Sequence, residues 1–541
     1  MRLPPGVSNE TFEAAIRGFE QAVGKDWVFT SEEDTDLYRD AYSPFWDQPE
    51  EKLVSAAVAP ANVEEVQQVV RIANQYKIPI YPISTGRNLG YGGSAPVLSG
   101  SVVLDLKRMN RVLEISEKNA YVLVEPGVSY FDLYRYIRDR GLKVWIDCPD
   151  PGWGSLIGNA LDRGGGYTRP QFRNHFDAHC GMEVVLANGE VMRTGMGAMP
   201  NAETWQQYKT GFGPWIDGMF SQSNFGVVTK MGFWLMPQPE AYFTGVVKVP
   251  RYKDLIPLVD TLNLLENGGV CNGMTSIGSP LLTRPIFGAA AAQDPELAQI
   301  LAKPDGGSPA ELEAYALRKQ TPYWSCGLKF YGPAKVIAAQ WEHAKEQFAA
   351  IQGATFEDGE LLRLPLTDEQ MKRSDLAEFG IPSLSIFAIG ARSETNPTPG
   401  NGHIWFSPII PRTGEAILEA NRVFAETARE LKLPTVMFSP PFSFWERSFV
   451  FINFFPITRN PEIDRKNREA FKVMIKKAAE HGWGEYRTAT TYYDDVMETY
   501  SFNNHALLRF HETVKDAVDP NGILAAGRYG IWPKHIRDTK T

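Results

Sequence analysis

The chain has 541 residues, of which 43% are hydrophobic and 22% charged, and its net charge is −9. This composition excludes a mainly disordered state and predicts roughly two or three folded units. The acidic balance gives nucleic acid or an anionic membrane surface no long-range attraction, so we expect a small-molecule ligand and neither of those partners.

The N-terminus is polar and has no basic-then-apolar signal pattern, which predicts a cytoplasmic protein. Four scattered cysteines without a C-x-x-C pair agree with a reduced compartment and suggest neither a disulfide scaffold nor a zinc ribbon. The longest strongly apolar stretch, 448–457, is about half of what a membrane helix needs. We therefore predict that it is a buried strand.

The first folded unit is predicted to open with a helix at 62–76, where apolar residues recur at helical spacing and Asn62 with Glu65 can cap the N-terminus. A short strand follows at 77–84, then a glycine-rich loop, then a second strand at 99–106. A Rossmann turn runs instead from a strand into a helix, so this loop must bind any ligand without that helix.

Later segments mix strands and helices in an α+β pattern, and helical runs become longer after about residue 250. We predict a domain boundary near residue 245. The polar, turn-rich stretch 391–402 is predicted to be an exposed loop. The longer helical runs are predicted at 294–301, 309–318, 334–349 and 415–431.

Several catalytic motifs are missing: the chain has no Walker loop, no G-x-S-x-G nucleophile elbow and no zincin pair. One metal-like spacing remains, because His175 and His179 would share a face if their segment were helical. No third ligand is evident, so we predict no metal, with a metal-dependent hydrolase as the alternative from another class.

The loop at 85–96 contains four glycines together with Arg87 and Asn88. Glycine allows positive φ and close approach of backbone N–H groups, so the loop can form an anion-binding nest for a pyrophosphate. A tight glycine hairpin is the structural alternative for the loop taken alone. The glycines are Gly86, Gly90, Gly92 and Gly93.

The loop is one of several blocks that together resemble a known family, over nearly the whole chain. They include PISTGRNLGYGGSAPVLSGSVVLDL, WGSLIGNALDRGGGYT, HGWGEYRTAT and DPNGILAAGRYGIWP. These blocks are similar to the 4-phenol-oxidizing branch of the vanillyl-alcohol oxidase flavoproteins. The resemblance implies an α+β, two-domain PCMH-type fold. Its FAD-binding domain would span 1–245 and be completed by 485–541, and a cap domain at 246–484 would form much of the substrate pocket.

The resemblance assigns the glycine loop to the FAD pyrophosphate and further blocks to the flavin. The residues implied to bind FAD are Ser84, Thr85, Gly86, Arg87, Asn88, Leu89, Gly90, Gly92, Pro126, Gly154, Ser155, Gly158, Asn159, Gly226, Val228 and Arg528.

Three residues match the family's phenolate-binding trio: Tyr91, Tyr486 and Arg487. A phenol with a pKa of about 10 is mostly neutral at physiological pH, and an arginine with two hydroxyl donors favours its anion. The phenolate weakens the benzylic C–H bond para to it, so hydride can pass to the flavin and leave a p-quinone methide.

Two positions depart from the family's pattern. The acid/base carboxylate that precedes a histidine in the family is matched to Asn174, ahead of His175, and Asp177 or His175 could substitute for it. The histidine segment that carries the covalent flavin link is matched to 439–455, which has no histidine and reads Glu446-Arg447 instead. The tyrosine used by another member would fall near 386–394, which also lacks it. We therefore predict non-covalent FAD.

The expected activity is oxidation of para-substituted phenols, including bulky lignin-derived or phenylpropanoid ones, with oxygen as the favoured electron acceptor. The predicted assembly is a homodimer or a larger homo-oligomer. The alternatives are a 2-hydroxy acid or sugar oxidase on the same fold and a flavin-binding protein without catalytic function. The residues predicted to line the substrate pocket are His175, Trp405, Phe444 and Arg447.

Overall fold

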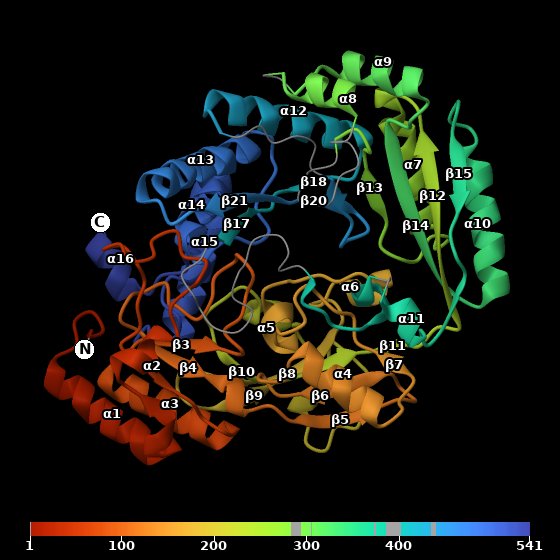
Figure 1. Cartoon of the computed structure of the whole chain (residues 1–541). Helices are drawn as coiled ribbons and strands as arrows, with labels where there is room; N and C mark the ends of the chain where they lie inside the picture. Colours follow the sequence, from red (N-terminus) through yellow and green to blue (C-terminus); the bar gives the residue numbers. More distant parts are fainter. Residues whose placement is uncertain are drawn as a thin grey trace.

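The computed structural model describes residues 2–282, 294–303, 306–372, 375–385, 402–433 and 440–540. Helices and strands are mixed along the described chain, and the two termini lie on the same side of the molecule (Figure 1). The loop expected at 391–402 falls outside the described residues apart from Gly402, and so does the segment 386–394.

The N-terminal part forms a four-stranded sheet in the order β1-β2-β4-β3, with α1 packed against α3. Strand β3 is parallel to β4, and the glycine loop joins them without a helix, as the sequence predicts. The predicted cap of α3 is also confirmed, because the Asn62 side chain accepts a hydrogen bond from Glu65 N–H. The elements are α1 (Asn9–Val23), β1 (Val28–Phe29), α2 (Glu32–Asp36), β2 (Ala56–Val58), α3 (Val63–Tyr76), β3 (Ile80–Ile83) and β4 (Val102–Asp105).

A second, antiparallel sheet follows in the order β5-β6-β10-β8-β9. The segment with the paired histidines is not helical, because His179 is the first residue of strand β8. The elements are β5 (Val112–Ser116), β6 (Tyr121–Val124), α4 (Tyr130–Asp139), β7 (Val144–Trp145), α5 (Leu156–Leu161), α6 (Pro170–Arg173), β8 (His179–Val185), β9 (Val191–Arg193), β10 (Val227–Trp234) and β11 (Met236–Pro237).

The largest sheet has eight strands in the order β15-β12-β14-β13-β19-β20-β18, with β16 also paired to β12. Helices α7, α9 and α10 lie around this sheet in Figure 1, and α12 lies against α7. The elements are β12 (Ala241–Val249), α7 (Leu255–Asn267), β13 (Ser276–Gly278), α8 (Pro295–Leu301), α9 (Pro309–Lys319), β14 (Trp324–Gly332), α10 (Ala334–Phe348), β15 (Thr355–Asp358), β16 (Leu362–Arg363), α11 (Asp368–Met371), β18 (Ile409–Pro411), α12 (Gly414–Glu430), β19 (Pro441–Phe442) and β20 (Ser448–Phe451).

The apolar stretch 448–457 is buried β structure, as predicted, but it forms two strands rather than one. Strand β20 belongs to the large sheet, whereas β21 (Asn453–Ile457) pairs with β17 (Gly402–Phe406). The chain thus leaves one sheet and joins another near Ile452. The four longer helical runs predicted after residue 250 coincide with α8, α9, α10 and α12. The division into domains at residues 245 and 485 stays a prediction.

The C-terminal segment returns to the N-terminal sheet. Ile80 N–H donates to Ile523 O, and Ala525 N–H donates to Ile80 O, both at 2.7 Å. Lys515 is fully buried and donates to the carbonyl oxygens of Asn224 and Leu524 at 2.8 and 2.7 Å. These contacts bring the turn after Leu524 beside the glycine loop. The helices of this part are α13 (Pro461–Glu480), α14 (Tyr493–Thr499), α15 (Phe502–Val518) and α16 (Lys534–Lys540).

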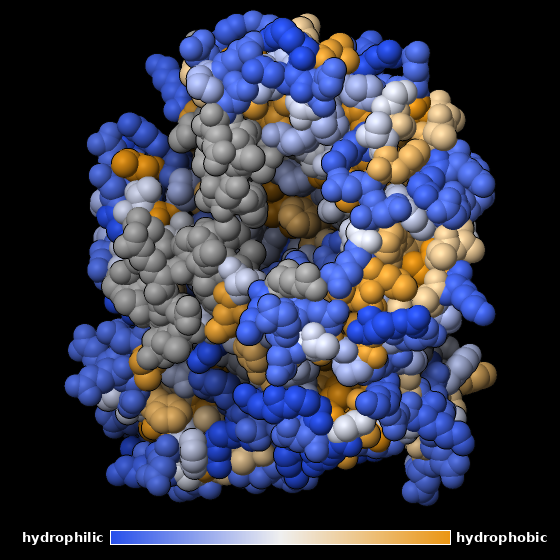
Figure 2. Space-filling view, turned by 45° about the vertical axis from the view of Figure 1, so that its right-hand side comes forward, coloured by the Kyte–Doolittle hydropathy of each residue, from blue (hydrophilic) through white to orange (hydrophobic). Residues whose placement is uncertain are grey.

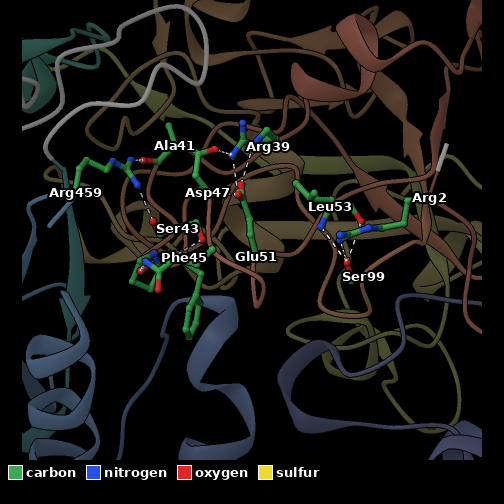
Figure 3. Close-up of polar contacts among 12 residues, drawn as sticks. Arg2, Arg39, Ala41, Ser43, Phe45, Asp47, Glu51, Leu53, Ser99 and Arg459 are labelled. Atoms are coloured by element: carbon green, nitrogen blue, oxygen red, sulfur yellow. Dashed lines mark hydrogen bonds and ion pairs between the residues drawn. The ribbon is translucent and has the colours of Figure 1, made fainter. Parts of the chain in front are cut away.

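The segment 39–51, which follows α2, makes polar contacts with a distant part of the chain (Figure 3). The guanidinium of Arg459, just before α13, donates to the carbonyl oxygens of Ala41 and Ser43. Within the segment, Arg39 pairs with Glu51 at 2.6 Å. The segment therefore ties the first sheet to the elements around α13.

The face in Figure 2 is mainly hydrophilic, with smaller patches of hydrophobic residues. Among the helices of the described residues, none is long and apolar enough to cross a membrane.

Candidate active site

A cavity of about 470 Å³ is lined by residues from the glycine loop, α5, the start of β10, the C-terminal turn and the β17/β21 pair. Its volume is typical of small-molecule and cofactor pockets. The C-terminal turn is hydrogen-bonded to β3, and the glycine loop begins directly after β3. Segments far apart in the sequence therefore meet at this cavity.

Almost all residues that the sequence assigns to FAD line this cavity. Gly90 does not: its φ is +76°, and a Cβ there would come within 2.9 Å of His403 O, so it lets the loop pass close to β17. The residues that do line the cavity are Ser84, Thr85, Gly86, Arg87, Asn88, Leu89, Gly92, Pro126, Gly154, Ser155, Gly158, Asn159, Gly226, Val228 and Arg528.

The residues present fit an FAD molecule. Gly86 has a φ of +66°, a conformation that side chains disfavour and that turns loop N–H groups toward an anion. Asn224 lines the cavity and its buried Oδ1 has no hydrogen-bond partner in the described part of the chain. Arg528 also lines it and is held by Asp162, with Arg528 Nη2 and Asp162 Oδ1 2.6 Å apart. The loop at Gly86 can therefore bind an anion through its backbone N–H groups. Arg528 supplies a positive charge, and Asn224 supplies an oxygen that is free to accept a hydrogen bond.

Tyr91, Tyr486 and Arg487 come together on the cavity wall. The centroids of the two tyrosine rings are 6.3 Å apart, and Arg487 Cζ lies 3.8 Å from the centroid of the Tyr91 ring. The buried Arg487 Nε has no hydrogen-bond partner in the described chain. The three side chains can therefore surround one anionic oxygen.

Backbone and side-chain contacts hold this trio in place. The Tyr91 hydroxyl is 2.7 Å from Ser407 Oγ, and Gln222 Nε2 donates to Tyr486 O at 2.7 Å. Arg487 Nη2 donates to Asn88 Oδ1 at 3.2 Å, which links the trio to the glycine loop. Burial raises the pKa of Tyr91 well above 10, and the neighbouring Tyr486 raises it further. Tyr91 therefore remains a neutral hydroxyl that can donate to an anion.

The four residues predicted for the substrate pocket separate into two pairs. Trp405 and Phe444 line the cavity, and Trp405 Nε1 donates to Leu89 O at 2.6 Å. His175 is buried outside the lining, and Arg447 is exposed. Further apolar lining comes from Phe442, Ile452 and Phe454 of the cap region. One part of the wall is therefore aromatic and aliphatic.

The structure does not bring Asn174 into the cavity lining. Its amide Nδ2 donates to Asp177 Oδ2 at 2.6 Å, and the Asp177 side chain is exposed. Neither of these residues, in this arrangement, faces a ligand bound in the cavity.

The sequence reasoning missed a carboxylate that does line the cavity, Asp150. Its Oδ1 is buried and has no hydrogen-bond partner in the described chain, and its side chain interacts with the Tyr167 hydroxyl. Burial raises the pKa of Asp150 to about 6, and the carboxylate of Asp375 adds to this shift, whereas the bond to Tyr167 opposes it. The sequence contained one signal for Asp150: it lies three residues before the WGSLIGN block, which was predicted to line the flavin.

The paired histidines bind different carboxylates: His175 Nε2 lies 2.9 Å from Asp147, and His179 Nε2 lies 2.9 Å from Asp217. Among the described residues, no group of three or more His, Cys, Asp or Glu side chains is arranged to hold a metal ion. Nothing in this part of the chain supports the hydrolase alternative.

Known proteins share this architecture. A family model described as an FAD binding domain matches residues 54–195. The 4-cresol dehydrogenase (hydroxylating) flavoprotein subunit of Pseudomonas putida is 34% identical over 98% of this chain and 97% of its own length. Among solved structures, 4-ethylphenol oxidase from Gulosibacter chungangensis, in complex with isoeugenol, is 35% identical with a TM-score of 0.83, and covers 99% of this chain and 100% of that chain. A p-cresol methylhydroxylase with substrate bound is 32% identical with a TM-score of 0.82, over 98% and 99% of the two chains.

The fold, the cavity and these similarities define an FAD-dependent oxidoreductase. More narrowly, the chain belongs to the vanillyl-alcohol oxidase and p-cresol methylhydroxylase flavoproteins, in the 4-phenol-oxidizing branch. The resemblance seen in the sequence is thereby confirmed, and so is the predicted α+β PCMH-type fold with a cap.

Proposed function

We propose that this protein oxidises para-substituted phenols at the benzylic carbon through a p-quinone methide. The observation that carries the proposal is the grouping of Tyr91, Tyr486 and Arg487 on a cavity that also contains apolar cap residues and the carboxylate of Asp150. The names of the relatives support it, because they refer to 4-cresol and 4-ethylphenol as substrates and to isoeugenol as a bound ligand.

The trio performs the first task, which is to bind the phenol as its anion. Arg487 supplies a fixed positive charge, and Tyr91 and Tyr486 supply hydroxyl donors around the same oxygen. The resulting phenolate donates electron density to its para position and weakens the benzylic C–H bond. FAD, when bound, supplies the acceptor for the hydride that leaves this carbon.

Asp150 performs the second task, which is proton transfer at the para substituent. A carboxyl group whose pKa is about 6 is largely ionised at neutral pH and can take a proton from a benzylic hydroxyl or from the water that adds to the quinone methide. The Tyr167 hydroxyl beside it holds the carboxylate in orientation. Asp150, rather than Asn174, therefore supplies the acid/base group.

The apolar part of the wall sets the substrate class. Phe442, Phe444 and Phe454 can accept a hydrophobic para substituent, so we include phenylpropanoids and lignin-derived dimers among the substrates. Molecular oxygen is the proposed electron acceptor, and a homodimer or a larger homo-oligomer is the proposed assembly.

The decisive experiment is an anaerobic screen in which the bleaching of the flavin absorbance is followed with para-substituted phenols, from 4-ethylphenol to lignin dimers. Rapid bleaching by at least one phenol is the expected result. Bleaching by lactate or by sugars, with none by any phenol, would replace this proposal with the 2-hydroxy acid or sugar oxidase alternative. Stopped-flow reoxidation in air then tests oxygen as the acceptor.

We also propose that FAD is bound without a covalent link. The segment 440–455 contains no histidine. Glu446 and Arg447 stand where the family has paired histidines, and Arg447 is exposed. Acid precipitation of the yellow protein is expected to leave the flavin in the supernatant. A yellow pellet, with a flavin-linked peptide in its mass spectrum, would contradict this proposal and identify the linking residue.

A further inference from the structure

Behind the cavity wall lies a buried pair that the proposed mechanism does not use, Asp147 and His175. Their side chains are almost fully buried, and His175 Nε2 lies 2.9 Å from Asp147 Oδ1. Asp147 also accepts hydrogen bonds from the backbone N–H groups of Tyr167 at 3.1 Å and Thr168 at 2.7 Å. Asp147 is therefore held by backbone donors on one side and faces the His175 ring on the other.

The other ring nitrogen of His175 points toward the cavity wall. Its Nδ1 lies 2.5 Å from Asn159 Oδ1, and the Tyr130 hydroxyl donates to the same oxygen at 3.4 Å. The Tyr130 hydroxyl also lies 3.1 Å from this Nδ1. Because the amide oxygen of Asn159 can only accept, an Nδ1–H group of His175 makes the contact with it. Asn159 also lines the cavity, and because its oxygen is engaged by His175, its amide N–H₂ is left for a ligand there.

The run Gly164-Gly165-Gly166 leaves the space in which this chain of contacts lies. A Cβ at Gly164 would come within 2.3 Å of Asn159 Oδ1. A Cβ at Gly166 would fall 1.3 Å from Asp147 Oδ1 and 2.8 Å from His175 Nε2. Neither glycine has a positive φ, so backbone conformation does not explain the choice of glycine here. The backbone is therefore shaped around Asp147, His175 and Asn159.

We propose that His175 is a positioning residue for the cofactor: held by Asp147, it orients Asn159 so that the amide N–H₂ donates a hydrogen bond to the isoalloxazine ring. The inference rests on the proposed function only in placing FAD in this cavity. The ring carries more negative charge when it is reduced, so a fixed donor binds the reduced form more tightly than the oxidised form. The pair thus favours flavin reduction without touching the substrate.

Two substitutions of His175 separate this role from a purely structural one. In H175Q the amide nitrogen can take the place of Nε2 and keep Asp147 paired, but the contact to Asn159 is lost. In H175N the amide nitrogen can take the place of Nδ1 and keep the contact to Asn159, but Asp147 loses its partner. The measurements are the two-electron reduction potential of the bound flavin and the thermal unfolding of the apoprotein.

If His175 positions Asn159, H175Q lowers the preference for reduced over oxidised flavin about tenfold, which is about 30 mV for two electrons. H175N then keeps the potential and lowers the unfolding temperature more than H175Q does. Equal potentials in wild type and H175Q, or an equal drop in both variants, would overturn the proposal. Should H175N fail to fold, N159A must reproduce the drop seen in H175Q, and an unchanged potential in N159A overturns the proposal as well.

The matched control is H179Q, because His179 is also fully buried and paired with a carboxylate, Asp217, but lies outside the cavity lining. Its flavin potential is expected to equal that of the wild type, and an equal drop in this control would count against a specific role for His175. A wild-type protein that binds no FAD would contradict the proposed function, whereas FAD binding with an unchanged potential in H175Q contradicts this inference alone.

Discussion

Replacing Arg487 with methionine is expected to lower kcat/KM for para-alkylphenols by about 100- to 1,000-fold, because the variant loses the positive charge that stabilises the phenolate. Methionine keeps much of the side-chain length but cannot donate a hydrogen bond. Steady-state kinetics on 4-ethylphenol and anaerobic flavin reduction measure the effect. Halogenated phenols, which ionise more readily, are expected to lose less than 4-ethylphenol does.

The matched control is Arg163→Met. Arg163 is exposed, lies outside the cavity lining and contacts Ser221 Oγ. Its replacement is expected to leave kcat/KM within about twofold of the wild type, because surface substitutions rarely have large effects. A loss in Arg487→Met that is the same for phenols of high and low pKa would argue against phenolate stabilisation and for general damage to the cavity.

The glycine loop and the trio were predictable because their chemistry is local in sequence. Four glycines in twelve residues predict a loop that can approach a ligand closely. Two members of the trio, Tyr486 and Arg487, are adjacent in the sequence. What the sequence could not show is that the hydroxyl of Ser407, the residue after β17, makes a hydrogen bond with the Tyr91 hydroxyl. That contact depends on pairing across more than three hundred residues.

The carboxylate that lines the cavity shows the opposite case. Matching positions along the sequence placed the family's carboxylate at Asn174. Sequence position alone does not show whether a side chain points into the cavity, because the local backbone conformation determines its direction. In the structure Asn174 caps α6 and binds Asp177, while Asp150 projects into the cavity from the segment before α5. The stretch 448–457 was predicted as one strand but forms two strands in different sheets. The reason is related: apolar character predicts that residues are buried, but not which sheet they join.

Replacing Asp150 with asparagine is expected to reduce the rate of 4-hydroxybenzyl alcohol oxidation by about 100- to 10,000-fold at neutral pH, since the amide cannot accept the hydroxyl proton. In the wild type the rate is expected to rise as the pH passes through about 6, where Asp150 ionises, and to level off above it. The variant should show no such rise. Rapid-mixing measurements of flavin reduction between pH 5 and 8 record both effects.

Stability data separate this catalytic loss from misfolding. Because burial raises the pKa of Asp150 in the folded protein, its protonated form favours the fold at low pH, and that contribution is lost as the pH rises through about 6. An uncharged asparagine avoids the cost of a buried charge, so the variant is expected to unfold at an equal or higher temperature than the wild type at pH 8.

Asp177→Asn is the matched control for this prediction, since that carboxylate is exposed, lies outside the cavity lining and accepts a hydrogen bond from the Asn174 amide. It is expected to keep both the wild-type rate and the rise near pH 6. If Asp177→Asn abolished the rise while Asp150→Asn retained it, the proton acceptor would have to come from the 174–177 turn, and this turn would have to move into the cavity when substrate binds.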